Sequence, residues 1–235
     1  HAMGILILEG YGLTETSPVL TVNRPDALRF GSVGQPMPGI EISIADDGEI
    51  LARGPNVMKG YWNRPEETAE AMEGGWFHTG DVGHLDEDNF LFITDRKKDL
   101  IVTAGGKNIA PQNIENTLKL DKYIEQVAVI GDRRKFVSAL IVPTWPELEE
   151  WAREQGIDTG DRIALCADER VNSMMKERID RALKDFDRHE RVTRFVLLPE
   201  EMTEAEGLLT PTLKVKRKEV ARVFEGEIES MYKGD

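Results

Sequence analysis

The stretch from residue 95 to residue 115 constrains the possible folds most, because it joins a charged segment to a short strand, a glycine turn and a helix. Residues 95–99 alternate in charge and are too polar for a core, whereas the apolar residues 100–102 predict a short strand. The glycines at 105–106 predict a turn where the backbone can approach another molecule, and Pro111 suits the first turn of a helix. Such a charged joint indicates either a hinge beside a ligand or a solvated linker between domains, and the linker is the more common case.

The composition restricts the class of protein. A chain of 235 residues allows one large domain or two smaller ones, and a hydrophobic content of 40% is ordinary for a globular core. The net charge of −13 argues against general attraction to nucleic acid or to an anionic membrane. Basic residues nevertheless cluster at 96–98 and between 214 and 218, where they would either bind a small anion or line a solvated helix face.

Cysteine usage and hydropathy bear on the compartment. The single cysteine, Cys166, excludes an internal disulfide and favours a reducing, cytoplasmic setting. No apolar run has the length of a transmembrane helix, and no signal peptide is visible. These features predict a cytoplasmic protein and leave peripheral membrane contact and the oligomeric state open.

The beginning of the chain predicts a strand followed by a polar loop. Residues 1–3 are typical of a cloning remnant, and the apolar residues 5–8 predict a buried strand, so that the chain would begin within a sheet, as a fragment does. In the loop that follows, Tyr11 could stack on a base, Thr14 could donate to a phosphate, and Glu15 could hold a hard cation. A polar turn capped by a tyrosine explains the same residues and is the more usual case.

Residues 31–91 predict an all-β region. Apolar and polar residues alternate over 40–44, and a turn at 46–48 predicts a hairpin into the next strand. Residues 66–72 predict a short acidic helix. Asp81 follows an aromatic strand and a glycine, where its carboxylate could accept both hydroxyls of a ribose, although an aspartate after glycine is more often a turn residue.

The second half of the chain predicts an α+β domain, which makes residues 95–99 the natural boundary. Its expected elements are helices at 112–120, 147–155 and 168–187, strands at 125–130, 137–142 and 195–198, and a closing helix from about residue 216.

Several of these stretches occur together in a characteristic order. They are Tyr11-Gly12-Leu13-Thr14-Glu15, then Gly48-Glu49-Ile50 with Gly60-Tyr61, then Trp76-Phe77-His78-Thr79-Gly80-Asp81, then residues 95–115. In this order and spacing the chain resembles the AMP-forming acyl-CoA synthetases of the adenylate-forming superfamily. Residues 95–115, the ending at 209–217 and the long segment from about 144 to 206 are most similar to the long-chain fatty-acid branch.

The resemblance implies roles in nucleotide binding. Tyr11 would stack on adenine, Thr14 would contact the α-phosphate, and Glu15 would hold Mg²⁺. Asp81 and Arg96 would bind the ribose hydroxyls of ATP or AMP.

It also implies roles in the two steps of the reaction. Lys98 would be the hinge residue, and Gly105 with Gly106 would lie against the pantetheine arm of coenzyme A. Lys214 would be the adenylation lysine, although Leu213 stands where many relatives have glycine and two further lysines lie close by, at 216 and 218.

The fold implied by the resemblance combines α/β and α+β parts. Residues 4–94 would be the end of a large nucleotide-binding domain, with its last strand and a distorted β-barrel subdomain. Residues 95–99 would be a hinge, and residues 100–235 a small mobile α+β domain.

The implied activity is that of a ligase that converts a fatty acid and ATP to acyl-AMP and then to the coenzyme A thioester, with a domain rotation between the steps. No Ser/Thr/Gly-rich phosphate loop followed by lysine occurs in the 235 residues, so we expect that the chain by itself does not make acyl-CoA. Alternatives are transfer to a carrier protein, activation of an aryl or short-chain acid, and a non-catalytic regulatory or interaction module.

Overall fold

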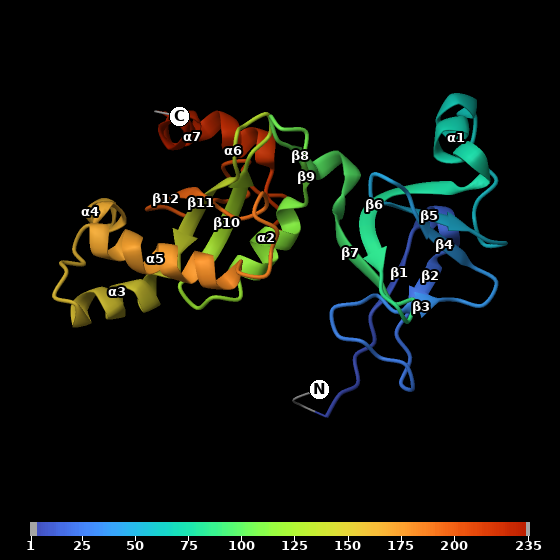
Figure 1. Cartoon of the computed structure of the whole chain (residues 1–235), viewed down its shortest axis with the longest axis horizontal. Helices are drawn as coiled ribbons and strands as arrows, with labels where there is room; N and C mark the ends of the chain where they lie inside the picture. The colour runs from blue at the N-terminus through green and yellow to red at the C-terminus, as the bar shows by residue number, and fades with distance from the viewer. Residues whose placement is uncertain (1–3, 234–235) are drawn as a thin grey trace. The chain divides into compact units, whose positions relative to one another are not determined.

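The computed structural model describes residues 4–233, so the predicted cloning remnant at residues 1–3 lies outside the described residues. The chain divides into two compact units, His1–Asp99 and Leu100–Asp235, which we call unit 1 and unit 2. Figure 1 shows the helices and strands that make up each unit. In the part of the chain that the structure describes, no helix is long and apolar enough to cross a membrane.

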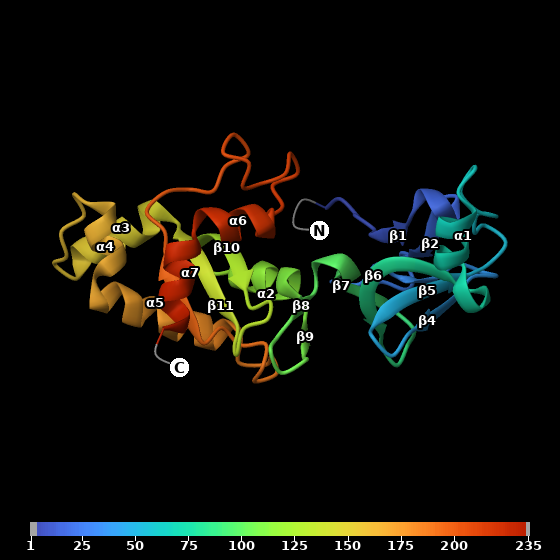
Figure 2. The same cartoon turned by 90° about the horizontal axis from the view of Figure 1, so that it is seen from above.

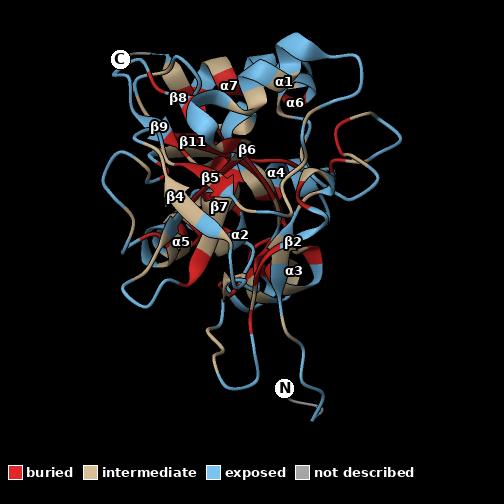
Figure 3. Cartoon of the chain, turned by 90° about the vertical axis from the view of Figure 1, so that its right-hand side faces the viewer, coloured by how far each residue is buried: buried red, intermediate tan, exposed pale blue. Residues whose placement is uncertain are grey.

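Unit 1 consists mainly of antiparallel strands, as the sequence predicts for residues 31–91. Two sheets are present, one of three strands in the order β1-β2-β3 and one of four strands in the order β4-β5-β6-β7. The strands are β1 (Gly10–Gly12), β2 (Val19–Val22), β3 (Gln35–Pro36), β4 (Glu41–Ile44), β5 (Glu49–Arg53), β6 (Phe77–Leu85) and β7 (Leu91–Arg96). A short helix, α1 (Pro65–Ala71), lies between β5 and β6 in the chain; it has no buried residue and is mostly blue in Figure 3.

The β4–β5 hairpin confirms the alternation in the sequence. Ile44 pairs with Ile50 across the turn, and Gly48 has a φ of 85°, a conformation that glycine adopts without steric cost. Ile50 and Ala52 on β5 are fully buried, and Ala52 packs in a small core with Leu20. Local pattern and turn chemistry are sufficient to specify this element.

The predicted strand at residues 5–8 is wrong. These residues have no strand assignment, and Ile5, Leu6 and Ile7 are 56%, 51% and 66% exposed. An apolar run forms a buried strand only where neighbouring strands pair with its edges and other elements cover its faces. The first strand in the described residues is instead β1, which pairs with β2.

Unit 2 is a mixed α/β layer structure around a three-stranded sheet in the order β10-β11-β12. Its elements are β8 (Ile101–Val102), β9 (Asn108–Ile109), α2 (Pro111–Leu118), β10 (Ile124–Ile130), β11 (Ser138–Pro143), α3 (Trp145–Glu154), α4 (Arg162–Ala167), α5 (Glu169–Ala182), β12 (Arg194–Leu197), α6 (Arg217–Val223) and α7 (Glu225–Tyr232). Except for β9 and α4, which were not predicted, each lies within a few residues of a predicted element.

The two faces of this sheet carry two different cores, because side chains alternate along β10 and β11. Val127 and Val129 of β10 face a cluster that includes residues of α2, α3 and α5. Ala128 and Ile130 face a cluster that includes residues of α6 and α7. Figure 1 shows α6 and α7 on the opposite side of the sheet from α5.

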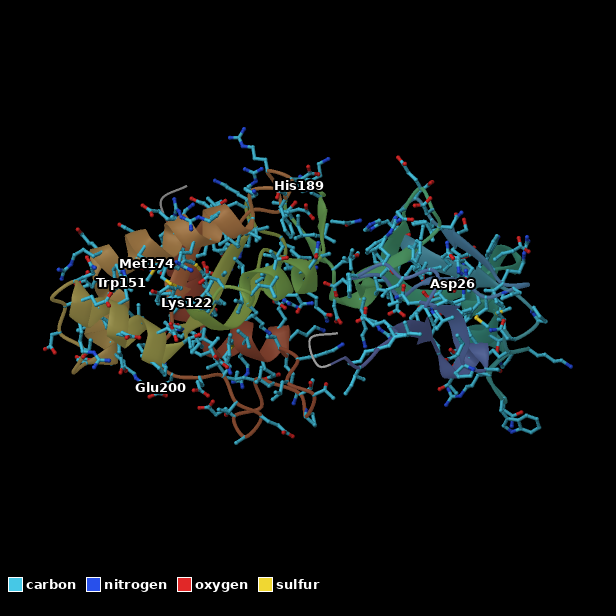
Figure 4. All side chains as sticks on the ribbon, turned by 90° about the horizontal axis from the view of Figure 1, so that it is seen from below. Asp26, Lys122, Trp151, Met174, His189 and Glu200 are labelled. Atoms are coloured by element: carbon cyan, nitrogen blue, oxygen red, sulfur yellow. The ribbon has the colours of Figure 1, made fainter. Side chains whose placement is uncertain are left out.

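Strands β11 and β12 run parallel, and a parallel pair requires a crossover connection. Helices α3, α4 and α5 form that crossover. The predicted apolar stripe of α5 is confirmed as core, since Val171, Met175 and Ile179 are fully buried, and Met174 and Trp151 (labelled in Figure 4) pack against the same cluster. Helix α4 was not predicted, although Asp161 caps it by accepting from Ile163 N at 2.8 Å.

Candidate functional site

Three of the predicted nucleotide-binding residues are in direct contact in unit 1. Asp81 lies in β6 opposite Arg96 of β7, and only 4% of Asp81 is exposed. The Tyr11 hydroxyl, from β1, donates to Asp81 Oδ2 at 2.6 Å, and Arg96 Nε lies 2.6 Å from Asp81 Oδ1. Among the described residues, each carboxylate oxygen therefore has one side-chain donor and keeps a further lone pair.

The alternative that Asp81 is a turn residue is wrong, because β6 continues through Leu85. Gly80 has a φ of 69°, and the pairing of β6 with both neighbours shifts register near Asp81. Register shifts of this kind re-aim side chains. Thr79 supports the bend, because its hydroxyl donates to Ile50 O at 2.7 Å and accepts from Asp81 N at 3.1 Å.

The Tyr11 hydroxyl remains a hydrogen-bond donor. Burial raises its pKa strongly, and the hydrogen bond to Asp81 raises it further. Arg96 lowers the pKa by a smaller amount. Tyr11 is therefore half-buried, packs against the small core that contains Leu20 and Phe77, and has its hydroxyl fixed on the carboxylate.

Glu15 and Thr14 lie in the loop that follows β1, in a single 3-10 turn, Thr14–Thr16. The Tyr61 hydroxyl donates to Glu15 Oε1 at 3.0 Å, and Met58 N donates to Glu15 O at 2.8 Å. The sequence predicts no role for Tyr61, and the only local signal is its position directly after Gly60. The contact fixes one carboxylate oxygen and leaves the other available.

Among residues 4–233 there is no cluster of three or more His, Cys, Asp or Glu side chains that could hold a metal by themselves. A single half-buried carboxylate nevertheless fits Mg²⁺, which keeps several waters and binds through one or two carboxylates together with substrate phosphates. The chemistry of Glu15 therefore fits a magnesium ion that arrives with a nucleotide.

A second buried carboxylate holds the segment after β7. Glu49 is 3% exposed and accepts from Gly80 N at 2.9 Å and from Lys97 Nζ at 2.8 Å; Lys97 Nζ is also 2.8 Å from Asp47 Oδ2. Sequence analysis missed this cluster. Lys98, the next residue, is exposed, and unit 1 ends at Asp99.

The two predicted coenzyme-A glycines lie at the tip of the β8–β9 hairpin in unit 2. Gly106 has a φ of 73°, so the turn itself favours glycine there. Gly105 is different: a Cβ at this position would meet nothing closer than Thr103 Oγ1 at 4.0 Å. The packing of unit 2 therefore does not require glycine at 105.

Lys214 lies in an exposed loop of unit 2 that is closed by the bridge between Leu209 and Val215. Thr210 N donates to Lys214 O at 2.8 Å, and Leu213 has a φ of 59° with 69% of its surface exposed. Leucine is strained in this conformation, which glycine adopts freely. Val215 packs against the core, so the residues on either side of it, Lys214 and Lys216, face away from that core.

Comparison with known proteins extends these observations. A family model described as AMP-binding enzyme matches residues 1–62, and one described as AMP-binding enzyme C-terminal domain matches residues 98–235. A long-chain-fatty-acid–CoA ligase of Mycobacterium tuberculosis is 43% identical over 230 residues, which cover 97% of this chain and 38% of that protein. Human long-chain-fatty-acid–CoA ligase 6 is 36% identical, with 98% of this chain and 35% of that protein covered.

Solved structures are similar as well. The O-succinylbenzoate coenzyme A synthetase of Bacillus subtilis in complex with AMP matches with a TM-score of 0.61 and 27% identity, over 90% of this chain and 40% of that one. An adenylation and carrier didomain of a carboxylic acid reductase from Segniliparus rugosus has a TM-score of 0.70 at 22% identity, over 97% of this chain and 31% of that one, and shows a shared fold only. The chain thus spans between 31% and 40% of the length of these four relatives.

Proposed function

Because this chain belongs to the AMP-binding enzymes, we propose that it is part of a ligase that activates a long-chain fatty acid with ATP and transfers the acyl group to coenzyme A. The observation that supports this best is the buried Asp81, held between the Tyr11 hydroxyl and Arg96. A purely structural role for Asp81 would not require both a tyrosine and an arginine beside its carboxylate.

The reaction would proceed in two half-reactions. In the first, a carboxylate oxygen of the fatty acid attacks the α-phosphorus of ATP, the bond to pyrophosphate breaks, and acyl-AMP forms. In the second, the thiol of coenzyme A loses its proton to solvent, its sulfur attacks the acyl carbon, the bond between that carbon and the phosphate oxygen breaks, and AMP leaves. The first step brings negative groups together, so it requires cations that offset their repulsion.

Unit 1 would bind the nucleotide. The Tyr11 ring would stack on adenine, and Asp81 would accept the ribose hydroxyls on the lone pairs that Tyr11 and Arg96 leave free. Arg96 would also contact the ribose. Thr14 would donate to the α-phosphate, and Glu15 would hold Mg²⁺, which neutralises phosphate charge when it is bound.

Unit 2 would serve the two steps with two different loops. Lys214 would bring its ammonium group to the carboxylate and the α-phosphate during adenylation. Gly105 and Gly106 would leave room for the pantetheine arm in the thioester step, which agrees with the absence of a packing reason for glycine at 105. Lys98, exposed at the end of unit 1, would be the pivot between the two arrangements.

The test uses the complete ligase that contains this chain. We expect it to form acyl-CoA from a long-chain fatty acid, ATP, Mg²⁺ and coenzyme A, and to exchange pyrophosphate into ATP only when the fatty acid is present. The Lys214→Ala variant should lose about 10²–10³-fold in exchange, while Lys216→Ala should keep it. Acyl transfer to a carrier protein but not to coenzyme A would contradict the proposed acceptor, and the opposite ranking of the two lysine variants would contradict the assignment of Lys214.

A further inference from the structure

We infer, on the basis of the proposed function, that the buried Glu115–Arg217 pair of unit 2 positions the Lys214 loop for adenylation and has no comparable role in thioester formation. Neither residue contacts a reacting atom in this assignment. Both act through the loop, so they are positioning residues.

The pair is the central contact between three elements. Glu115 lies on α2 and is 5% exposed, and its Oε1 accepts from Val129 N of β10 at 2.9 Å and from Arg217 Nη2. Arg217, the first residue of α6, also donates from Nε to Val129 O at 3.0 Å. Figure 2 shows α2, β10 and the start of α6 side by side.

The pair has an obvious structural role. In the sheet order β10-β11-β12, β10 is an outer strand, and the N–H and C=O of Val129 point away from β11. Glu115 and Arg217 satisfy both groups, as a further strand would, and buried backbone groups must be satisfied. Burial of Glu115 raises its pKa, and Arg217 counteracts the shift without reversing it. The pair thus covers the free edge of β10.

The position of Arg217 in the chain indicates that the pair also holds the Lys214 loop. Only two residues separate Arg217 from Lys214, and one of them, Val215, is tied to Leu209 by the bridge that closes the loop. Lys216 N donates to Leu208 O at 2.8 Å, so the loop from 208 to 216 is a closed unit. On its carboxyl side, the first buried polar contact is that of Arg217.

Within the loop, Lys214 N donates to Thr210 Oγ1 at 3.1 Å, but among the described residues no other side-chain bond ties this end of the loop to the rest of unit 2. Lys216 is the N-cap residue of α6, and no side-chain hydrogen bond caps the helix there. The exposed fraction of the Arg217 side chain is 20%, whereas Lys214 and Lys216 are both exposed. Loss of the Arg217 contacts would free the start of α6 and, with it, the angle at which the closed loop presents Lys214.

The first experiment measures the two half-reactions separately in the complete ligase. Arg217→Met keeps the length of the side chain and removes both donors, and we expect fatty-acid-dependent pyrophosphate exchange to fall by about 10–100-fold, as a misplaced catalytic group would cause. The rate of thioester formation from supplied acyl-AMP should change by less than about threefold, which is smaller than the loss expected from a misplaced catalytic group. Arg217→Lys keeps the positive charge but lacks the forked donors of arginine, so its rate of pyrophosphate exchange should lie between those of the wild type and Arg217→Met.

A matched control is available in the same unit. Arg178 pairs with Asp121 through Nε at 2.7 Å, and its side chain is 25% exposed, close to the value for Arg217. Arg178→Met removes a comparable ion pair that is remote in sequence from the Lys214 loop. The ratio of the rates of the two half-reactions should therefore stay the same as in the wild type. If Arg217→Met lowers both half-reactions in proportion, or lowers neither, the pair only stabilises the fold and the inference is wrong.

A second measurement does not depend on activity. In the present chain, Arg217→Met should raise amide hydrogen exchange over residues 208–216 by about tenfold or more, with no change in α5, because local opening follows local contacts. Unchanged exchange over 208–216 would overturn the inference. If the unmodified ligase shows no fatty-acid-dependent exchange of pyrophosphate, the proposed function fails instead, and the amide-exchange result still decides whether Arg217 holds the loop.

Discussion

Replacement of Glu49 by glutamine tests how unit 1 holds the segment that leads to Lys98. The side chain of Glu49 is 4% exposed and accepts from Gly80 N, from His78 Nδ1 at 2.9 Å and from Lys97 Nζ at 2.8 Å. Hydrogen bonds to a charged group contribute about 1.5–3 kcal/mol each. Glutamine keeps the size and one acceptor, so the bond from Gly80 can remain while the contact with Lys97 loses its charge.

The magnitude follows from these contacts. The side chain of Lys97 is 46% exposed and would still pair with Asp47 in the variant. The contribution of its contact with Glu49 to stability is therefore reduced by solvent screening. We expect Glu49→Gln to lower the local unfolding free energy of unit 1 by about 2–3 kcal/mol. The amides of β5, β6 and β7 should then exchange hydrogen about 30–150-fold faster at neutral pH.

The effect should depend on pH in one direction. Burial raises the pKa of Glu49, but hydrogen bonds from Lys97, His78 and Gly80 outweigh burial, so the folded pKa lies below the usual 4.5. A carboxylate with a lowered pKa stabilises the fold fully above its unfolded pKa and loses that contribution as the pH falls through the folded value. The difference between the wild type and Glu49→Gln should therefore be largest above pH 4.5 and shrink below it.

Glu41→Gln is the matched control, because Glu41 lies on the same hairpin and pairs with Arg53 at the surface. The two side chains are 58% and 51% exposed, so solvent screens the pair and its contribution to stability is small. If Glu49→Gln destabilises unit 1 no more than Glu41→Gln does, or if the difference stays constant between pH 3 and pH 7, our account of the Glu49 cluster is refuted.

Three further predictions concern the complete ligase. Lys98→Pro should impair one half-reaction more than the other, as separate half-reaction assays would show; equal loss of both, or of neither, would make residues 95–99 a simple linker. Asp81→Asn puts a donor where the structure has an acceptor, so the KM for ATP should rise by about 10–100-fold, and an unchanged KM would contradict the ribose role. Gly105→Leu should leave thermal stability unchanged, since the added Cβ would meet nothing closer than Thr103 Oγ1 at 4.0 Å, and should slow the thioester step alone; a drop in Tm would indicate a folding role instead.

Local patterns in the sequence predict local structure well in this chain. The β4–β5 hairpin, the β8 strand and the stripe of α5 each follow from residues within one element and its turn. The failures have a common cause. The apolar run at 5–8 has the right composition for a strand but no strand beside it in the described residues, and Asp81 follows a glycine yet lies within β6 because of pairing with β5 and β7.

The candidate site shows the same limit. The resemblance placed Asp81 and Arg96 at the same ribose, and the structure brings these two together. It gave no partner for Glu49, for Glu115 or for Tyr61, since these contacts join residues 48, 102 and 46 positions apart. No periodicity or spacing in a single sequence carries information on such pairs. The roles of Lys98, Gly105, Gly106 and Lys214 stay predictions.

The basic residues divide into two groups by how they are held. Arg96, Lys97 and Arg217 are each paired with a carboxylate that is at most 5% exposed, on Asp81, Glu49 and Glu115 respectively. Their sequence neighbours Lys98 and Lys214 are exposed, and these are the two lysines that the proposed function requires to change their surroundings between steps. An exposed lysine next to an anchored cation can move with little loss of buried contacts, because the anchor keeps the backbone attached to its own unit. The proposed rotation of unit 2 about Lys98 would use this arrangement on both sides of the pivot, and Arg217→Met tests it on the side of Lys214.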